Sequence, residues 1–225
     1  MISMVCQSTP STTCSLPITT RINAAACKPA IALVTHYHLD HCDGTEYLRR
    51  RHGTKLILHP RVASALKEVR TLQAPWLPRR PIHPNGLWPD EGLWQWKEYQ
   101  FRVAPWPGQT WWHCLFMTDI AGQEVAFAGD TFQPPTRWNG TGGFCAYNRS
   151  SFSQGFIPSA TRILEWQPDI VAAGHGTVCV FNPARFEKIM AWARRAEQAV
   201  TELCPTGDLD RDYYHWGTPW CEEQY

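Results

Sequence analysis

The chain has 225 residues, of which 44% are hydrophobic and 18% charged, a composition typical of a globular protein and not of a disordered one. Its 21 Lys and Arg residues nearly balance 20 Asp and Glu residues, so a formal net charge of +1 provides no broad electrostatic surface for long nucleic acid or an anionic membrane. Nine cysteines without a CxxC pair, no signal-like N-terminus and no apolar run near the roughly 20 residues that span a bilayer favour a cytoplasmic protein with reduced thiols.

The first half of the chain alternates short apolar runs with turn signals. Residues 1–28 are rich in Ser, Thr and Pro without periodicity, and we expect a loose arm or an incomplete edge of the fold. Strands are expected at 31–35 and 55–59, and helices at 45–51, ending before Gly53, and at 61–69. The Pro- and Trp-rich stretch 74–89 is expected to be an irregular loop.

The second half begins with strand patterns and ends with a long helix. Strands are expected at 95–103, 111–118, 124–128 and 169–173, a long loop at 131–155 and helices at 159–166 and 183–203. The last helix carries an apolar stripe, which we expect to pack on the core: Phe186, Ile189, Met190, Ala193, Ala196, Ala199, Val200 and Leu203. Alternating strands and helices predict a layered α/β domain over 29–204, followed by an unassigned tail at 205–225.

A histidine cluster stands directly after the first expected strand. The segment 34–44, VTHYHLDHCDG, holds three of the nine histidines of the chain. His36 and His38 are two residues apart at a strand end, so their side chains point to the same side, and Asp40 and His41 follow on the turn. Imidazole and carboxylate are good zinc ligands, so we expect two metals in one pocket, with the first pair on one metal and the second pair on the other.

Three further ligand candidates each stand on a loop at the end of an expected strand. His113 lies in PWPGQTWWHC, Asp130 in AFAGDTF and His175 in VAAGHGT. Glycines beside two of them allow close approach of the backbone, and loops at strand ends are a usual place for functional residues. Four ligands from the histidine cluster cannot complete two metal sites, so these three are expected to complete them.

The order of these segments resembles the metallo-β-lactamase-fold superfamily of metal-dependent hydrolases. THYHLDH, a Pro-Gly turn followed by histidine, Gly-Asp and Gly-His-Gly occur in the family's order over residues 30–180. The resemblance implies an αββα sandwich with the active site on loops at one edge. It also implies these ligand sets: His36, His38 and His113 for the first metal, Asp40, His41 and His175 for the second, and Asp130 bridging the two.

Three features of the sequence distinguish this chain within that resemblance. With an aspartate at position 130 the chain resembles relatives such as glyoxalase II, lactonases, phosphodiesterases and tRNA-processing nucleases, which carry a bridging aspartate there. This resemblance argues against a genuine β-lactamase. Gln109 stands after Pro-Gly, where the family usually has histidine. Only 35 residues precede His36 and they contain no Asp or Glu, so the first sheet is either shortened or built differently from the family's.

The resemblance implies hydrolysis by a metal-bound hydroxide, with two zinc ions per chain as the expected cofactors and iron or manganese as alternatives. Asp40 is the catalytic candidate, and Arg137 and Asn139 are candidates for contact with a small-molecule substrate. An ester, thioester, lactone or amide is the expected substrate. The alternatives are a phosphodiesterase or nuclease, and a non-catalytic or redox metal-binding relative. The tryptophans near the site, Trp106, Trp111, Trp112 and Trp138, either line a substrate pocket or pack the sandwich, and the oligomeric state is open.

Overall fold

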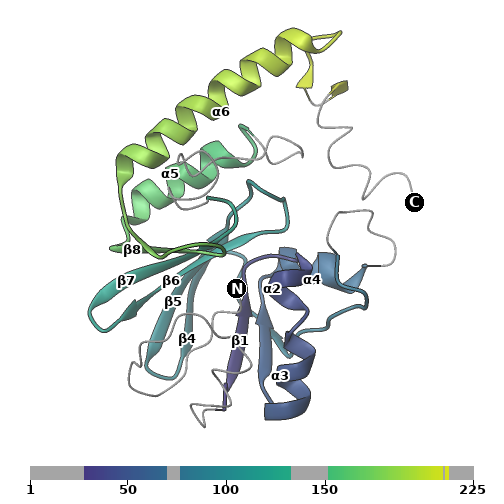
Figure 1. Ribbon diagram of the computed structural model, residues 1–225, viewed down its shortest axis with the longest axis vertical. Coiled ribbons are helices and arrows are strands. Elements are labelled where there is room, and N and C mark those ends of the chain that lie inside the picture. The colour runs from purple at the N-terminus through teal and green to yellow at the C-terminus, as the bar shows by residue number, and fades with distance from the viewer. Residues whose placement is uncertain (1–27, 70–76, 133–151, 210, 213–225) are drawn as a thin grey trace.

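Two β-sheets lie face to face, with helices on the outer side of each (Figure 1). The computed structural model describes residues 28–69, 77–132, 152–209 and 211–212. One sheet has three strands in the order β1-β2-β3 and the other has six in the order β4-β5-β6-β7-β8-β9. This arrangement is the αββα sandwich that the family resemblance implies. The arm at 1–28 and the tail at 205–225 lie mostly outside the described residues.

The small sheet is parallel, and its two longer strands, β1 and β2, are mainly apolar. It contains β1 (Ile31–Val34), β2 (Lys55–Leu58) and β3 (Gly86–Leu87), covered by α2 (Leu39–Cys42), α3 (Thr45–His52) and α4 (Pro60–Lys67). All four residues of β1 are buried, as expected for a strand covered on both faces. Helix α3 ends at Gly53, whose φ of 70° lies in the left-handed region that closes many helices.

The large sheet is mainly antiparallel. Its strands are β4 (Gly92–Trp96), β5 (Tyr99–Pro105), β6 (Cys114–Ile120), β7 (Gln123–Gly129), β8 (Ile170–Ala173) and β9 (Cys179–Val180). The single strand expected at 95–103 is wrong, because the chain turns within it and forms the β4–β5 hairpin. Lys97 takes a φ of 51° at this turn, so the turn is made without the Gly or Asn that usually marks one.

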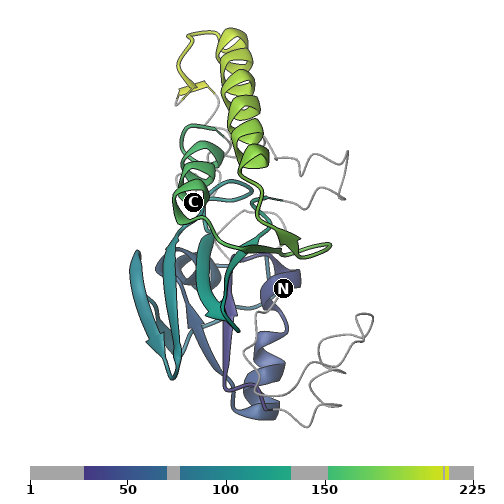
Figure 2. The ribbon, with the colours of Figure 1, turned by 90° about the vertical axis from the view of Figure 1, so that its left-hand side faces the viewer.

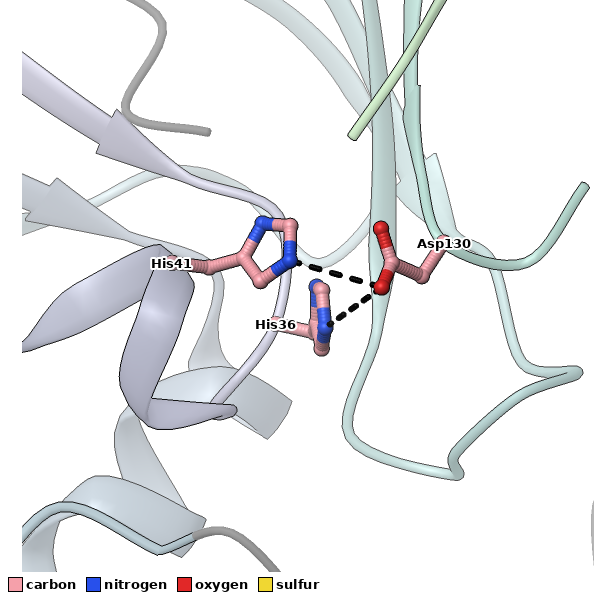
Figure 3. A group of neighbouring side chains, drawn as sticks. All are labelled: His36, His41 and Asp130. Carbon is pink, nitrogen blue, oxygen red and sulfur yellow. Dashed lines mark ion pairs between the residues drawn. The ribbon is translucent and has the colours of Figure 1, made fainter. Parts of the chain in front are cut away.

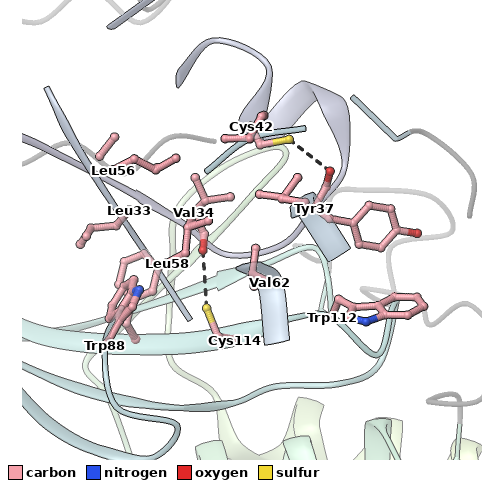
Figure 4. Packing of buried hydrophobic residues seen from close by; sticks show 14 of the residues in the cluster. Leu33, Val34, Tyr37, Cys42, Leu56, Leu58, Val62, Trp88, Trp112 and Cys114 are labelled. Atoms are coloured by element: carbon pink, nitrogen blue, oxygen red, sulfur yellow. Dashed lines mark hydrogen bonds between the residues drawn. The ribbon is translucent and has the colours of Figure 1, made fainter. Parts of the chain in front are cut away.

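Strand alternation in the large sheet divides the core into two layers. Val103 and Phe116 are register partners that face the small sheet, whereas the next partners, Ala104 and Leu115, face the opposite way. The layer between the sheets is rich in aromatic and branched side chains and includes Trp88 and Leu33 (Figure 4). The outer layer packs under the C-terminal helices.

Those C-terminal helices are α5 (Phe156–Trp166) and α6 (Pro183–Leu203). Helix α6 begins as expected, because Asn182 caps it by accepting a hydrogen bond from the Ala184 N–H. Its apolar stripe is only partly core, because Phe186, Ile189 and Ala193 are buried and Leu203 is 84% exposed. The later turns extend away from the sheets (Figure 2). None of the described helices is long and apolar enough to cross a membrane.

Candidate metal centre

The predicted ligand segments meet where the end of β1 reaches the beginning of β6. His36, after β1, and His113, before β6, pair in an isolated β-bridge that joins the two sheets. The Cys114 N–H donates to the Thr35 carbonyl at 2.8 Å and supports the same junction. The site is therefore assembled from both sheets.

Helix α2 presents the outer part of the site. The Oδ2 atom of Asp40 lies 3.3 Å from His41 Nε2 and 3.2 Å from His175 Nε2, and the two imidazole nitrogens are 3.2 Å apart. His41 is buried, whereas Asp40 is 48% exposed and His175 is 33% exposed. These three side chains are the set predicted for the second metal, and they form a compact triangle of ligand atoms at the solvent side.

Asp130 lies at the centre of the cluster, at the end of β7. Its Oδ2 atom is 3.1 Å from His175 Nε2, 3.4 Å from His41 Nε2 and 3.9 Å from His36 Nε2. Figure 3 shows Asp130 facing His36 and His41 across the gap between the strand and α2. This central place agrees with the bridging role that the resemblance implies, although the role itself stays a prediction.

The inner part of the site contains the remaining histidines. The rings of His36 and His113 stack at 4.7 Å, and the ring of His38 meets His36 edge-on at 4.6 Å. Within the described residues, ligand atoms lie within 4.8 Å of one another in two groups. One group is His36, His41 and Asp130, and the other is Asp40, His41 and His175. The assignment of His38 and His113 to the first metal therefore stays a prediction.

Hydrogen bonding defines the tautomer of His113. Its Nδ1 donates to the Cys114 carbonyl at 3.1 Å, since a carbonyl can only accept. Its Nε2 accepts the Asp130 backbone N–H at 3.2 Å. Nε2 thus carries the lone pair, the tautomer in which this nitrogen could bind a metal in place of the Asp130 N–H.

Two glycines, which lack a Cβ atom, leave space for the ligand side chains to come together. A Cβ at Gly174 would lie 2.1 Å from Asp130 Oδ1 and 2.6 Å from His41 Cε1. A Cβ at Gly129 would lie 2.5 Å from His113 Nε2. All three distances are far below van der Waals contact, so both positions need glycine because of close approach.

Burial keeps the inner imidazoles neutral. Desolvation lowers the pKa of His38 to about 4 and that of His113 to about 3, and it holds the pKa of His36 well below its usual range. Burial alone would raise the pKa of Asp130, but hydrogen bonds from His175 and His41 outweigh it, and the pKa lies well below its usual range. At neutral pH His36, His38 and His113 are therefore neutral beside the Asp130 carboxylate.

These residues fit a divalent metal. The Nε2 atom of His36 is buried and has no hydrogen-bond partner among the described residues, a state that costs free energy unless another group binds it. Imidazole nitrogens and carboxylate oxygens are donors that suit zinc, and the related transition metals iron and manganese. His36, His38, Asp40, His41, His113, Asp130 and His175 are the residues that would hold metal.

Two polar residues that contact the candidate ligands have no distinguishing signal in the sequence. Thr35 Oγ1 lies 3.0 Å from His36 Nδ1, and the Gln109 amide donates to Asp130 Oδ2 at 3.1 Å. The only sequence signal for them is their position within the ligand segments. Of the tryptophans, Trp106 is fully buried and packs against Phe132, so it belongs to the core.

The remaining candidates for substrate contact lie partly inside and partly outside the described residues. Arg137, Asn139 and Trp138 lie outside the described residues. Trp112 is buried, and its ring meets Tyr37 edge-on at 5.6 Å. Trp111 is half-buried beneath the Arg61 guanidinium, which lies 4.4 Å from the ring centre.

Solved structures share this fold at low sequence identity. A HARLDQ-motif mutant of a metallo-beta-lactamase from Cronobacter sakazakii has a TM-score of 0.60 and 18% identity, covering 83% of this chain and 81% of that chain. A beta-lactamase from Chitinophaga pinensis has a TM-score of 0.56 and 16% identity, covering 80% and 77%. An archaeal metallo-beta-lactamase superfamily protein from Sulfolobus tokodaii has a TM-score of 0.53 and 16% identity, covering 73% and 68%.

The family match extends beyond the fold to the sequence itself. No curated protein matches the chain. The family described as the metallo-beta-lactamase superfamily matches residues 14–175, which is well over half of the chain and includes every candidate ligand. The chain belongs to the metallo-beta-lactamase superfamily.

Proposed function

We propose that this protein is a metal-dependent hydrolase that acts on a small ester, thioester, lactone or amide, with two zinc ions as its cofactors. The observation that carries the proposal is the convergence of imidazole and carboxylate ligand atoms around Asp130 Oδ2, at 3.1 to 3.9 Å, from segments far apart in the chain. Metal bound there would supply an activated water at neutral pH and a Lewis acid for the substrate oxygen.

The candidate ligands form a buried group and a solvent-exposed group, which suit different roles. His36, His38 and His113 are buried and neutral, so they provide lone pairs without competing protons at neutral pH. Their burial also excludes bulk water from the inner half of the cluster. The inner histidines and Asp130 are therefore suited to hold and orient metal.

Asp40 and His175 form the solvent-facing side, where a substrate would approach. Asp40 Oδ2 lies beside both His41 and His175, within 3.3 Å of each nitrogen. We assign Asp40 the further role of taking up the proton released by the attacking water and returning it to the leaving group. A carboxylate that is half exposed can exchange that proton with solvent between turnovers.

The decisive experiment compares the zinc-loaded protein with a double variant, His38→Ala/Asp130→Ala, on ester, thioester, lactone, amide and phosphodiester substrates. Hydrolysis by the native protein and its loss in the variant is the expected result, because the variant lacks one inner ligand and the central carboxylate. His83→Ala/Asp119→Ala changes the same residue types at exposed positions and should retain full activity. Unchanged activity in the ligand variant would reject the assignment.

Metal analysis and the substrate panel also separate the alternatives. Turnover confined to the phosphodiester substrates would replace carbonyl hydrolysis by phosphodiester hydrolysis at the same site. Uptake of iron with no hydrolysis of any substrate would indicate a redox relative instead of a hydrolase.

A further inference from the structure

A buried glutamine contacts the central carboxylate of the candidate metal centre. Gln109 is 9% exposed and its Nε2 donates to Asp130 Oδ2 at 3.1 Å. A carboxylate accepts hydrogen bonds, so the NH₂ end of the amide must face it. We propose that Gln109 is a positioning residue, which orients the Asp130 carboxylate for metal binding and so sets the affinity and geometry of the site.

The contact involves the oxygen on which the site converges. His41 and His175 approach the same Oδ2 atom at 3.4 and 3.1 Å. Gln109 thus holds, from a third direction, the same oxygen that the two imidazole nitrogens approach, and this contact constrains where that oxygen lies. The hydrogen bond also removes the rotational freedom of the carboxylate about its χ2 bond, a broad torsion in aspartate.

The loop that carries Gln109 is held in place on both sides. At its start the Trp106 N–H donates to the His113 carbonyl at 2.9 Å, and the Ser159 hydroxyl donates to the Pro107 carbonyl. A Cβ at Gly108 would lie 2.4 Å from Thr131 Cγ2, so the backbone is pressed against the residue that follows Asp130. Such anchoring places the amide before metal binds, which reduces the entropy that binding costs.

Glutamine gives this position a property that histidine lacks. An amide side chain has no proton to gain or lose near neutral pH, so it donates to Asp130 in the same way at every working pH. A histidine there would donate only in the right tautomer or when protonated. The hydrogen bond from Gln109 to Asp130 therefore needs no particular tautomer or protonation state of its donor.

The proposal rests on the proposed function in one respect only, namely that the cluster binds divalent metal. Its test is therefore a metal titration, with Co²⁺ as a visible probe and Zn²⁺ by calorimetry, on the full chain. Gln109→Leu removes the donor at nearly constant volume, and Gln109→His restores a donor. Gln95→Leu is the matched control, because Gln95 is an exposed glutamine in the β4–β5 hairpin whose amide donates to the Lys97 carbonyl and not to a candidate ligand.

We expect Gln109→Leu to weaken binding of the probe metal by 10- to 100-fold and to change the Co²⁺ visible spectrum, which reports ligand geometry. Gln109→His, which can place a ring N–H near the carboxylate, should bind the probe metal more tightly than Gln109→Leu. Gln95→Leu should match the native protein. If Gln109→Leu folds poorly, Gln109→Asn, which keeps an amide but shortens it by one carbon, should show the same spectral change.

The results separate this proposal from the proposed function. A Gln109→Leu protein with native metal affinity and native Co²⁺ spectrum would overturn the positioning role even if the enzyme is an active hydrolase. A native protein that binds metal tightly and hydrolyses none of the substrates would overturn the hydrolase proposal and leave the positioning role intact. A native protein that takes up no divalent metal would overturn both.

Discussion

A single methyl group at Gly174 should disable the outer part of the metal centre. The Cβ of Gly174→Ala would lie 2.1 Å from Asp130 Oδ1 and 2.6 Å from His41 Cε1. Ordinary contact begins at 3.4 Å, so the carboxylate or the backbone must move by about 1.3 Å, several times the ~0.2 Å tolerance of a metal–ligand distance. The backbone cannot easily retreat, because the Gly174 N–H is bonded to the Gly129 carbonyl at 2.6 Å.

We expect Gly174→Ala to remain folded but to bind less zinc than the native protein and to lose the proposed hydrolytic activity. Overpacking of this size costs about 1–3 kcal/mol of unfolding free energy, a fraction of the stability of an ordinary domain. Zinc per chain would be measured by elemental analysis after dialysis, beside circular dichroism and activity. Gly122→Ala is the control, because its methyl would enter open space in the β6–β7 turn and only the φ of 81° would penalise it.

The outcome that would refute this reasoning is native zinc content and native activity in Gly174→Ala. The ligands would then tolerate a displacement that the structure says they cannot, and the convergence of Asp130 and His41 at this glycine would not be part of the site. Loss of metal from Gly122→Ala as well would show that zinc content reports general stability and not ligand geometry.

Three further predictions concern the inner ligands and the helices. Gly129→Ala should weaken metal binding through His113 Nε2, which would lie 2.5 Å from the new Cβ, and Co²⁺ spectroscopy would report the altered ligand. The metal-free protein should lose stability as the pH falls below 6.5. In the unfolded chain His38 and His113 become protonated near that pH, whereas in the folded protein burial lowers their pKa values to about 4 and about 3. For His38 alone the loss is about 3 kcal/mol, to be measured by urea unfolding across that range, and a flat profile would contradict it. Asn182→Ala should remove the cap of α6 and cost about 1 kcal/mol in the same assay without changing metal content.

The ligand segments could be found from the sequence because each carries its chemistry locally. The histidine cluster follows a strand of four buried residues, and the Gly-Asp and Gly-His pairs end strands of the same apolar kind. Side chains at strand ends project into loops, so short apolar runs ending in His or Asp are visible without knowledge of the partners. Strand and helix positions at β1, β2, α3 and α6 are confirmed for the same reason.

Features created by distant partners could not be found in this way. Strand β3 has two residues, too few for any periodicity, and it exists because Asn85 and Trp88 bond the backbone of β2 at 2.7 and 3.1 Å. The bond from Gln109 to Asp130 joins residues 21 apart, and neither side chain predicts it alone. The β4–β5 turn at Lys97 lacks a Gly or Asn signal, so the strand pattern runs through it without interruption.

The metal centre is also the joint between the two sheets, which links metal binding to folding. The small sheet and α2 carry His36 and His41, whereas the large sheet carries His113 and Asp130, so the ligand cluster exists only while the sheets are docked. Without metal this joint contains the closely packed neutral imidazoles of His36 and His113, and the buried Nε2 atom of His36 has no hydrogen-bond partner in the part of the chain that the structure describes, which opposes docking. The aromatic layer between the sheets must offset that cost in the metal-free state. Bound metal would add about 4 kcal/mol to the free energy of unfolding when its free concentration is a thousand times its dissociation constant. It would do so at the point where His36 and His113 join the two sheets.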